Sequence, residues 1–201
     1  MNVFQAGLFE GKVVLITGGG TGIGRALALA FGELGAMVVI AARREGPLSE
    51  VVKTIEDRGG RACMYTLDVR DEARVEEVVR GIWQDVGGVD VLVNNAGGNF
   101  TSPAVAMSAH GFRTVLDINL VGTFLMSQAV GRRWPWSGVG RVFVSTRCCP
   151  VLCVRKEVTS VCGRMRRWWS GWKRGFRWGV SRRPATWWAW WCFWPRKPGL
   201  F

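Results

Sequence analysis

The fold is decided by the stretch Val13-Val14-Leu15-Ile16-Thr17-Gly18-Gly19-Gly20-Thr21-Gly22-Ile23-Gly24-Arg25. It consists of a short apolar run, a turn dense in glycine, and the start of a helical pattern. Glycines in the spacing Gly-x-x-x-Gly-x-Gly permit a tight turn, a close approach of the backbone to a phosphate, and close packing of helix on strand. The free N–H groups and the positive dipole end of the following helix attract a pyrophosphate. The stretch therefore predicts a dinucleotide-phosphate site.

Strand and helix patterns alternate along the chain. Short apolar runs predict strands, and apolar residues recurring at helical spacing predict helices. The expected strands are Lys12–Thr17, Met37–Ala42, Ala62–Leu67, Val89–Val93 and Arg141–Val144. The expected helices carry their apolar residues within 23–34, 48–55, 75–82 and 112–130. This alternation predicts right-handed βαβ units and an α/β fold, a Rossmann-type doubly wound parallel sheet that is incomplete at its C-terminal half.

The composition divides the chain into two parts. Residues 1–131 hold 11 Lys and Arg against 14 Asp and Glu, whereas residues 132–201 hold 16 against 1. Eleven of the twelve tryptophans also lie in the second part, where Trp and Arg follow neither helical nor strand alternation. We therefore predict a dinucleotide-binding domain over 1–131 and an anomalous Trp/Arg-rich segment over 132–201, with at most one further strand at 141–145.

Three interpretations of the Trp/Arg-rich segment stay open. Its composition is what G/C-rich DNA yields in a wrong reading frame, so we hypothesise that residues from about 132 onward are translated out of frame. Alternatively, Arg and Trp could bind nucleic acid or a membrane surface, although they do not segregate onto faces. A zinc site would need paired Cys-x-x-Cys ligands or a nearby histidine, which are lacking at Cys148, Cys149, Cys153 and Cys162. We predict no metal and no specific nucleic-acid partner.

The end of the second expected strand indicates which nicotinamide cofactor the site selects. A site selective for NAD places a carboxylate there, which bonds both ribose hydroxyls. This chain has Ala41-Ala42-Arg43-Arg44 instead, and a guanidinium can bind a 2′-phosphate through two hydrogen bonds. We therefore predict NADP over NAD, with Arg43 as the contact. The alternative is that both arginines are solvated loop residues.

Four motifs follow one another on the expected elements: Thr17-Gly18-x-x-x-Gly22-x-Gly24, Asp68-Val69, Asn94-Asn95-Ala96-Gly97 and Asp117-Ile118-Asn119-Leu120. Their order and positions resemble the short-chain dehydrogenase/reductase family over residues 8–131. The resemblance implies that Asp68 contacts the adenine and that Asn95 and Ala96 lie beside the adenosine ribose. Alternatively, the Asn-Asn-Ala-Gly turn only terminates a strand. The predicted cofactor-binding residues are Gly18, Gly20, Thr21, Gly22, Ile23, Gly24, Arg43, Asp68, Val69, Asn95, Ala96 and Gly97.

The loop Gly97-Gly98-Asn99-Phe100-x-Ser102-Pro103 is similar to that of 2,4-dienoyl-CoA and trans-2-enoyl-CoA reductases within the family. This resemblance implies hydride transfer from NADPH to an enoyl-CoA, dienoyl-CoA or carbonyl substrate in fatty acid metabolism. Family members also commonly form homo-oligomers through their fourth and fifth helices. Only the fourth is recognisable in this sequence.

Asn119 is a candidate catalytic residue on two grounds. Its expected helix face is apolar and is predicted to point inward, with Phe112, Val115, Leu116, Leu120 and Thr123 on it. A buried amide needs hydrogen-bond partners, so it is either a structural bridge or part of a site. The family resemblance implies that Asn119 holds a water in a proton relay of Asn, Ser, Tyr and Lys. It also places the serine of this relay at Ser145 or Thr146.

The tyrosine and the lysine of that relay are not found. The window at residues 155–163, where the resemblance places the pair, contains no tyrosine. The single tyrosine of the chain is Tyr65, on the third expected strand, and Lys156 has no tyrosine at the required spacing. Two functions therefore stay open: an NADP-dependent short-chain reductase, and a catalytically dead, cofactor-binding remnant of such an enzyme.

Cysteine usage and hydropathy bear on localisation. Residues 1–131 contain one cysteine, Cys63, which fits a reducing cytoplasm. Met1–Glu10 lacks the basic start and apolar run of a signal peptide. No apolar run reaches the ~18 residues of a transmembrane helix. We predict a cytoplasmic protein.

Overall fold

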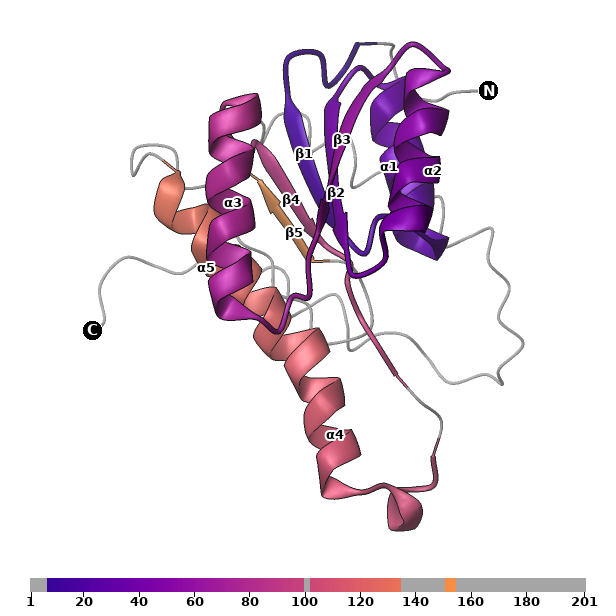
Figure 1. Cartoon of the computed structure of the whole chain (residues 1–201), viewed down its shortest axis with the longest axis vertical. Helices are drawn as coiled ribbons and strands as arrows, with labels where there is room; N and C mark the ends of the chain where they lie inside the picture. The colour runs from indigo at the N-terminus through magenta and orange to yellow at the C-terminus, as the bar shows by residue number, and fades with distance from the viewer. Residues whose placement is uncertain (1–6, 100–101, 135–150, 155–201) are drawn as a thin grey trace, which may run out of the picture. The chain divides into compact units, whose positions relative to one another are not determined.

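A computed structural model describes residues 7–99, 102–134 and 151–154 of the chain. Its centre is a five-stranded sheet in the order β3-β2-β1-β4-β5 (Figure 1). The strands are β1 (Val13–Thr17), β2 (Met37–Ala42), β3 (Arg61–Thr66), β4 (Val91–Asn94) and β5 (Val151–Val154). Strands β1 to β4 pair in parallel, and β5 pairs antiparallel with β4.

The four parallel strands confirm the predicted α/β class. Their order 3-2-1-4 is that of the first part of a Rossmann-type sheet. The strand expected at 141–145 lies outside the described residues. The sequence pattern does not single out β5, and its antiparallel direction departs from the all-parallel sheet that we predicted. An antiparallel edge strand on an otherwise parallel sheet is common in doubly wound folds.

Helices cover both faces of the sheet. The helices α1 (Gly22–Glu33) and α2 (Glu45–Glu56) lie on one face, and α3 (Glu72–Val86) and α5 (Gly122–Arg133) on the other (Figure 1). On the second face, strand residues such as Leu15, Val39 and Leu92 share one buried cluster with Val79 of α3 and Met126 of α5. Because both faces are covered, the strands are nearly continuous apolar runs rather than alternating ones.

The helix ends follow the signals in the sequence. Asp71 caps α3 by accepting a hydrogen bond from the backbone N–H of Arg74 at 3.0 Å, and Gly87 ends this helix with a φ of 81°. Pro47 lies in the first turn of α2, where its missing N–H removes no helical hydrogen bond. The predicted inward residues of α3 are all buried, namely Val75, Val78, Val79 and Ile82.

The predicted inward face of α1 needs a correction. Ile23 is 55% exposed, and Ala30 is exposed as well. Phe31 and Leu34 are buried as predicted, and the other buried positions of α1 are the small residues Gly24 and Ala28. Small side chains at these two positions allow the helix to approach the sheet closely.

The single long helix predicted over 112–130 is present as three consecutive parts. Helix α4 (Ala109–Leu116) leads into a π-helical turn, η2 (Asp117–Val121), which continues as α5. A 3-10 turn, η1 (Ala104–Ala106), precedes α4, and Ser108 caps α4 by accepting from the N–H of Gly111 at 3.0 Å. Short π segments inside helices are rare and often lie at functional sites.

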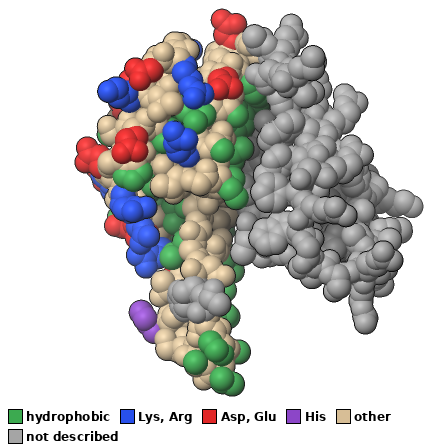
Figure 2. Space-filling model, turned by 90° about the vertical axis from the view of Figure 1, so that its right-hand side faces the viewer, with side chains coloured by type: hydrophobic (Ala, Val, Ile, Leu, Met, Phe, Trp, Pro, Cys, Tyr) green, Lys and Arg blue, Asp and Glu red, His purple; other side chains and the backbone are tan. Residues whose placement is uncertain are grey.

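The predicted inward face of this long helix is wrong for its first half. Phe112, Leu116 and Leu120 are 54%, 39% and 50% exposed. The buried residues of this long helix begin only at Gly122 and Thr123, in the first turn of α5. Hydrophobic side chains also gather at the lower end of the described part, where Figure 1 places η1 and α4 (Figure 2).

None of the helices that the structure describes is both long enough and apolar enough to cross a membrane.

One carboxylate joins α3 to the end of α5. Glu76 accepts hydrogen bonds from Arg132 at 3.2 Å and from Arg133 at 2.8 Å. The hydrogen bond from Arg133 is the main reason why the pKa of Glu76 lies below its usual range, although burial acts in the opposite direction. Directly after α5, Trp134 donates from its indole N–H to the carbonyl of Val89.

We expect Glu76→Gln to remove a pH-dependent part of the stability. A carboxyl whose pKa is lower in the folded state stabilises the fold above its unfolded pKa, and this contribution is lost as the pH falls through the folded pKa. Urea denaturation between about pH 7 and pH 3 should therefore show a steeper loss of stability for the wild type than for E76Q. Glu77→Gln is the control, because Glu77 is far more exposed and its ion pair with Arg74 lies within α3. Parallel pH curves for wild type and E76Q would contradict the expectation.

Candidate cofactor site

A cavity of about 420 Å³ lies beyond the carboxyl ends of the parallel strands. The strand order reverses beside β1, which lies between β2 and β4. In open α/β sheets this reversal point is where ligands bind. The walls come from the glycine-rich turn, from the ends of the strands and the segments that follow β2, β3 and β4, and from η2. The wall residues are Gly18, Gly20, Thr21, Ile23, Ala41, Ala42, Arg43, Arg44, Pro47, Leu67, Asp68, Val69, Asn95, Ala96, Gly97, Gly98 and Ile118.

The structure brings the predicted cofactor residues together, with two exceptions. All of them line the cavity except Gly22 and Gly24. Of the predicted catalytic residues, Asn119 lies beside the cavity and not in its wall. Ser145 and Thr146 lie outside the described residues. Several wall residues were not predicted, among them Pro47, Leu67, Gly98 and Ile118, because apolar character alone does not separate a cavity wall from a core.

Gly18 and Gly24 leave no space for a side chain. A Cβ on Gly24 would overlap the carbonyl oxygen of Gly18 and lie 2.5 Å from Nδ2 of Asn95. Gly18 has a φ of +68°, and its Cβ would lie 3.0 Å from the Cα of Ala96. Gly24 is therefore absent from the wall because it packs α1 against the strand ends, which is one of the roles predicted for these glycines.

Gly22 serves a different purpose from its neighbours. Its φ is +53°, a conformation that side chains disfavour, yet no atom lies within 4 Å of the place of its Cβ. The backbone at the start of α1 is thus open to an approaching group. This is the arrangement that a helix N-terminus needs for contact with a phosphate.

The buried hydroxyl of Thr17 connects the two loops on either side of the cavity. Its Oγ1 accepts hydrogen bonds from the backbone N–H groups of Asn95 and Ala96, both at 3.0 Å. In return, the Asn95 side chain donates to the carbonyls of Thr17 at 3.0 Å and of Gly18 at 3.2 Å. Thr17 is only 1% exposed. We predicted Thr17 as the start of a motif, but no sequence signal indicated this connection.

Asp68 reaches the cavity from the segment after β3, and Arg70 holds its carboxylate. The guanidinium of Arg70 donates to Oδ2 at 2.6 Å and from Nε to both oxygens, and the N–H of Arg70 donates to Oδ1 at 3.1 Å. These hydrogen bonds lower the pKa of Asp68, burial opposes them, and the charge of Arg43 acts in the same direction as Arg70. Asp68 therefore stays ionised near neutral pH.

Asn119 occupies the π turn η2 and is exposed, so the prediction that its amide is buried is wrong. Its Nδ2 donates to the carbonyls of Gly98 and Val115, both at 2.7 Å. The absence of a side chain at Gly97 permits this approach, because a Cβ there would lie 2.9 Å from Oδ1 of Asn119. The amide thus connects the helix to the loop after β4, at the edge of the cavity.

Tyr65 lies on β3 and does not line the cavity. Its hydroxyl donates to Asp85 of α3 at 2.5 Å, and burial followed by this hydrogen bond raises its pKa. Burial, with a smaller effect of Asp85, also raises the pKa of the neighbouring Cys63 to about 11. Neither group is poised for proton transfer near neutral pH.

Within the described ranges, no group of three or more His, Cys, Asp or Glu side chains could hold a metal ion.

The comparison with known sequences decides the family. A sequence model described as short chain dehydrogenase matches residues 12–148. The chain belongs to the short-chain dehydrogenase family. Within this family it is 43% identical over 126 residues to a peroxisomal 2,4-dienoyl-CoA reductase of Arabidopsis thaliana, a match that covers 63% of this chain and 42% of that relative.

Solved structures of short-chain dehydrogenases agree with this assignment. A citronellol catabolism dehydrogenase of Pseudomonas aeruginosa superimposes with a TM-score of 0.63 at 40% identity, covering 65% of this chain and 54% of that one. A metagenomic short-chain oxidoreductase in complex with NADP gives a TM-score of 0.60 at 32% identity, covering 62% and 57%. These matches confirm the predicted family and fold.

This short-chain dehydrogenase chain spans less than half the length of the curated relatives that it matches first. The family match also extends to residue 148, beyond the change of composition at residue 132. The division of the chain at residue 131 stays a prediction.

Proposed function

We propose that the cavity binds NADP and that the chain is an oxidoreductase of the short-chain dehydrogenase type. The observation that carries the proposal is the position of the cavity. It lies at the reversal point of the sheet, with Gly18, Gly20 and Thr21 of the glycine-rich turn and Asp68 from the segment after β3 in its wall. The residues fit the cofactor, because Gly18, Gly20 and Gly22 leave the backbone accessible to a pyrophosphate.

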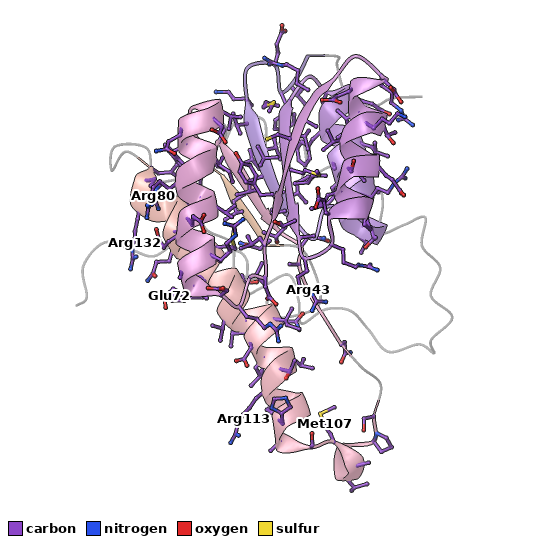
Figure 3. All side chains as sticks on the ribbon, in the orientation of Figure 1. Arg43, Glu72, Arg80, Met107, Arg113 and Arg132 are labelled. Carbon is purple, nitrogen blue, oxygen red and sulfur yellow. The ribbon has the colours of Figure 1, made fainter. Side chains whose placement is uncertain are left out.

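The end of β2 supports NADP over NAD. Ala41, Ala42, Arg43 and Arg44 all line the cavity, and none of them is acidic. Figure 3 shows Arg43 at the end of β2, where the chain leaves the sheet. Its guanidinium would bind the 2′-phosphate, whereas a carboxylate at this place would repel it.

The proposed reaction is the reduction of an enoyl-CoA, dienoyl-CoA or carbonyl substrate. The support is the loop after β4 and the name of the Arabidopsis relative, which describes that relative as a 2,4-dienoyl-CoA reductase. The cofactor would supply the hydride. Asn119, through the loop that its amide holds, would position the substrate side of the cavity, and Ser145 and Thr146 stay candidates for holding the substrate oxygen.

The second candidate function is cofactor binding without turnover. It is favoured by the place of Tyr65, the single tyrosine of the chain, which lies on β3 with its hydroxyl bound to Asp85 and outside the cavity wall. A proton donor must come within hydrogen-bond reach of the substrate. Tyr65 does not meet this requirement.

One experiment separates the two candidates. The full 201-residue chain is titrated with NADPH, followed by fluorescence, and is then assayed for oxidation of NADPH with a 2,4-dienoyl-CoA and with a trans-2-enoyl-CoA. Binding with turnover supports the reductase, and binding without turnover supports the second candidate. Absence of NADPH binding would overturn both.

The out-of-frame hypothesis for the Trp/Arg-rich segment gives a separate prediction. The family match continues through residue 148, so the change of reading frame that the hypothesis requires lies near the end of this match and not at residue 132. We expect one of the other two reading frames of the gene to encode a Tyr-x-x-x-Lys pair downstream of that point. Translation of the two frames is the measurement. Two frames without such a continuation would contradict the hypothesis.

The cytoplasmic location stays a prediction, and the Arabidopsis relative is named as peroxisomal.

A further inference from the structure

The wall of the cavity holds three charged side chains, two basic and one acidic, namely Arg43, Arg44 and Asp68. Neither of these arginines forms an ion pair with a carboxylate in the part of the chain that the structure describes. The acidic side chain, in contrast, is paired with Arg70, which does not line the cavity. The two guanidiniums of the wall are therefore available for an anionic ligand.

Arg70 saturates the carboxylate of Asp68. Its Nη2 donates to Oδ2 at 2.6 Å, its Nε contacts both oxygens at 3.0 and 3.2 Å, and its backbone N–H donates to Oδ1 at 3.1 Å. A carboxylate has about four acceptor sites, and these four contacts occupy them. As long as Arg70 is in place, the carboxylate has no acceptor site left for a second arginine.

Arg43 is placed to bind this carboxylate once Arg70 is removed. Strands β2 and β3 pair in parallel, and beyond β3 the N–H of Leu67 continues the pairing by donating to the carbonyl of Ala42 at 3.0 Å. Arg43 and Asp68 directly follow these two residues, so their side chains start from neighbouring points at the strand ends. The hydrogen bonds from Arg70 lower the pKa of Asp68 most, and the charge of Arg43 acts in the same direction.

We propose that Arg70 is a positioning residue that prevents Asp68 from pairing with Arg43, and so keeps the Arg43 guanidinium available for the 2′-phosphate of NADP. This inference rests on the proposed function. Without Arg70, the released carboxylate would bind Arg43 and would also repel a phosphate in the same cavity. Both effects weaken the binding of NADP and spare NAD, which has no phosphate at this position. Arg70 thus determines the cofactor preference through the charge balance of the wall.

The test measures the dissociation constants of NADP⁺ and NAD⁺ for the full chain by isothermal titration at one ionic strength. Because the two ligands differ only in the 2′-phosphate, the ratio of the two constants isolates the contribution of this group. For Arg70→Gln we expect the preference for NADP⁺ to fall by roughly tenfold, as for the loss of a hydrogen bond between charged groups. The affinity for NAD⁺ should change by less than about threefold.

A second substitution distinguishes this role from a merely structural one. In the double variant D68N/R70Q, the wall no longer contains a carboxylate that could bind Arg43. We therefore expect the double variant to regain the NADP⁺ preference of the wild type to within about threefold. If Arg70 only supported the local structure, removal of its partner as well would not repair the defect.

Arg74→Gln is the matched control for the loss of one positive charge. Arg74 also contacts the end of β3, where its Nε donates to the carbonyl of Thr66 at 3.4 Å. Its ion pair is with Glu77 at 2.6 Å, and neither member of this pair lines the cavity. R74Q should therefore keep the NADP⁺ preference of the wild type. If R70Q does not fold, Arg70→Lys replaces it, with a smaller expected fall because lysine keeps the charge and loses the two-pronged contact.

Any of four results would overturn the inference. An unchanged preference in R70Q would show that Asp68 does not compete for Arg43, and equal weakening of both ligands would make Arg70 a structural residue only. A lost preference that D68N does not restore would mean that Arg70 binds the phosphate itself. In these three cases, tight binding of NADP⁺ by the wild type leaves the proposed function standing. No binding of NADP⁺ by the wild type would overturn the proposed function and this inference together.

Discussion

Replacing Gly24 with alanine should weaken NADP binding by roughly 10- to 100-fold and lower the free energy of unfolding by about 1–3 kcal/mol. The added methyl group would overlap the carbonyl oxygen of Gly18 and press against the side-chain amide of Asn95. The backbone at Gly18 must move away from α1 to accept the methyl group, and the Asn95 amide cannot turn aside without losing its hydrogen bonds to the carbonyls of Thr17 and Gly18. NADPH titration and urea denaturation of the same protein measure the two effects.

Gly46→Ala is the control for this variant. Gly46 lies in the first turn of α2, and no atom lies within 4 Å of the place of its Cβ. Alanine there should leave cofactor affinity unchanged and stabilise the helix slightly. If G24A and G46A bind NADP equally well, the close contact of α1 with the strand ends does not shape the site.

Arg43→Asp should move the preference of the chain from NADP toward NAD. The substitution removes a guanidinium that would bind the 2′-phosphate and supplies a carboxylate that would bond the ribose hydroxyls. We expect the ratio of the NAD and NADP dissociation constants to change by roughly 100-fold. Isothermal titration with both cofactors at one ionic strength measures this ratio.

Arg44→Asp separates the role of position 43 from the effect of charge alone. Both arginines line the cavity and both substitutions change the net charge equally. The ratio should change less in R44D than in R43D, because Arg43 directly follows the end of β2. An unchanged ratio in R43D refutes the assignment of Arg43 to the 2′-phosphate.

The sequence was sufficient to predict the features that depend on local patterns. The strands β1 to β4 and the buried face of α3 follow from apolar runs and helical spacing, and the glycines of the turn follow from the space that they must leave free. Arg43 was predicted as part of the cavity wall from the residues after β2, whereas Asp68 and Asn95 were predicted because the family resemblance implies them.

The sequence was not sufficient where a property depends on what covers a surface. The stripe with Phe112, Leu116 and Leu120 has helical periodicity, but periodicity does not tell which element packs on it. The exposure of Asn119 and the π turn that contains it were missed for this reason. The hydrogen bonds of Thr17 and Arg70 were missed because they join residues through side-chain geometry, which has no sequence pattern.

The hydroxyl of Thr17 has a thermodynamic consequence for the binding of a ligand. Its hydrogen bonds, all made with groups of the protein itself, join the end of β1 to the loop after β4. The conformational entropy of ordering these two segments is therefore lost during folding and not during association. Such a preorganised cavity keeps more of its contact energy as affinity, and mutations that loosen the segments should reduce affinity without altering a single ligand contact.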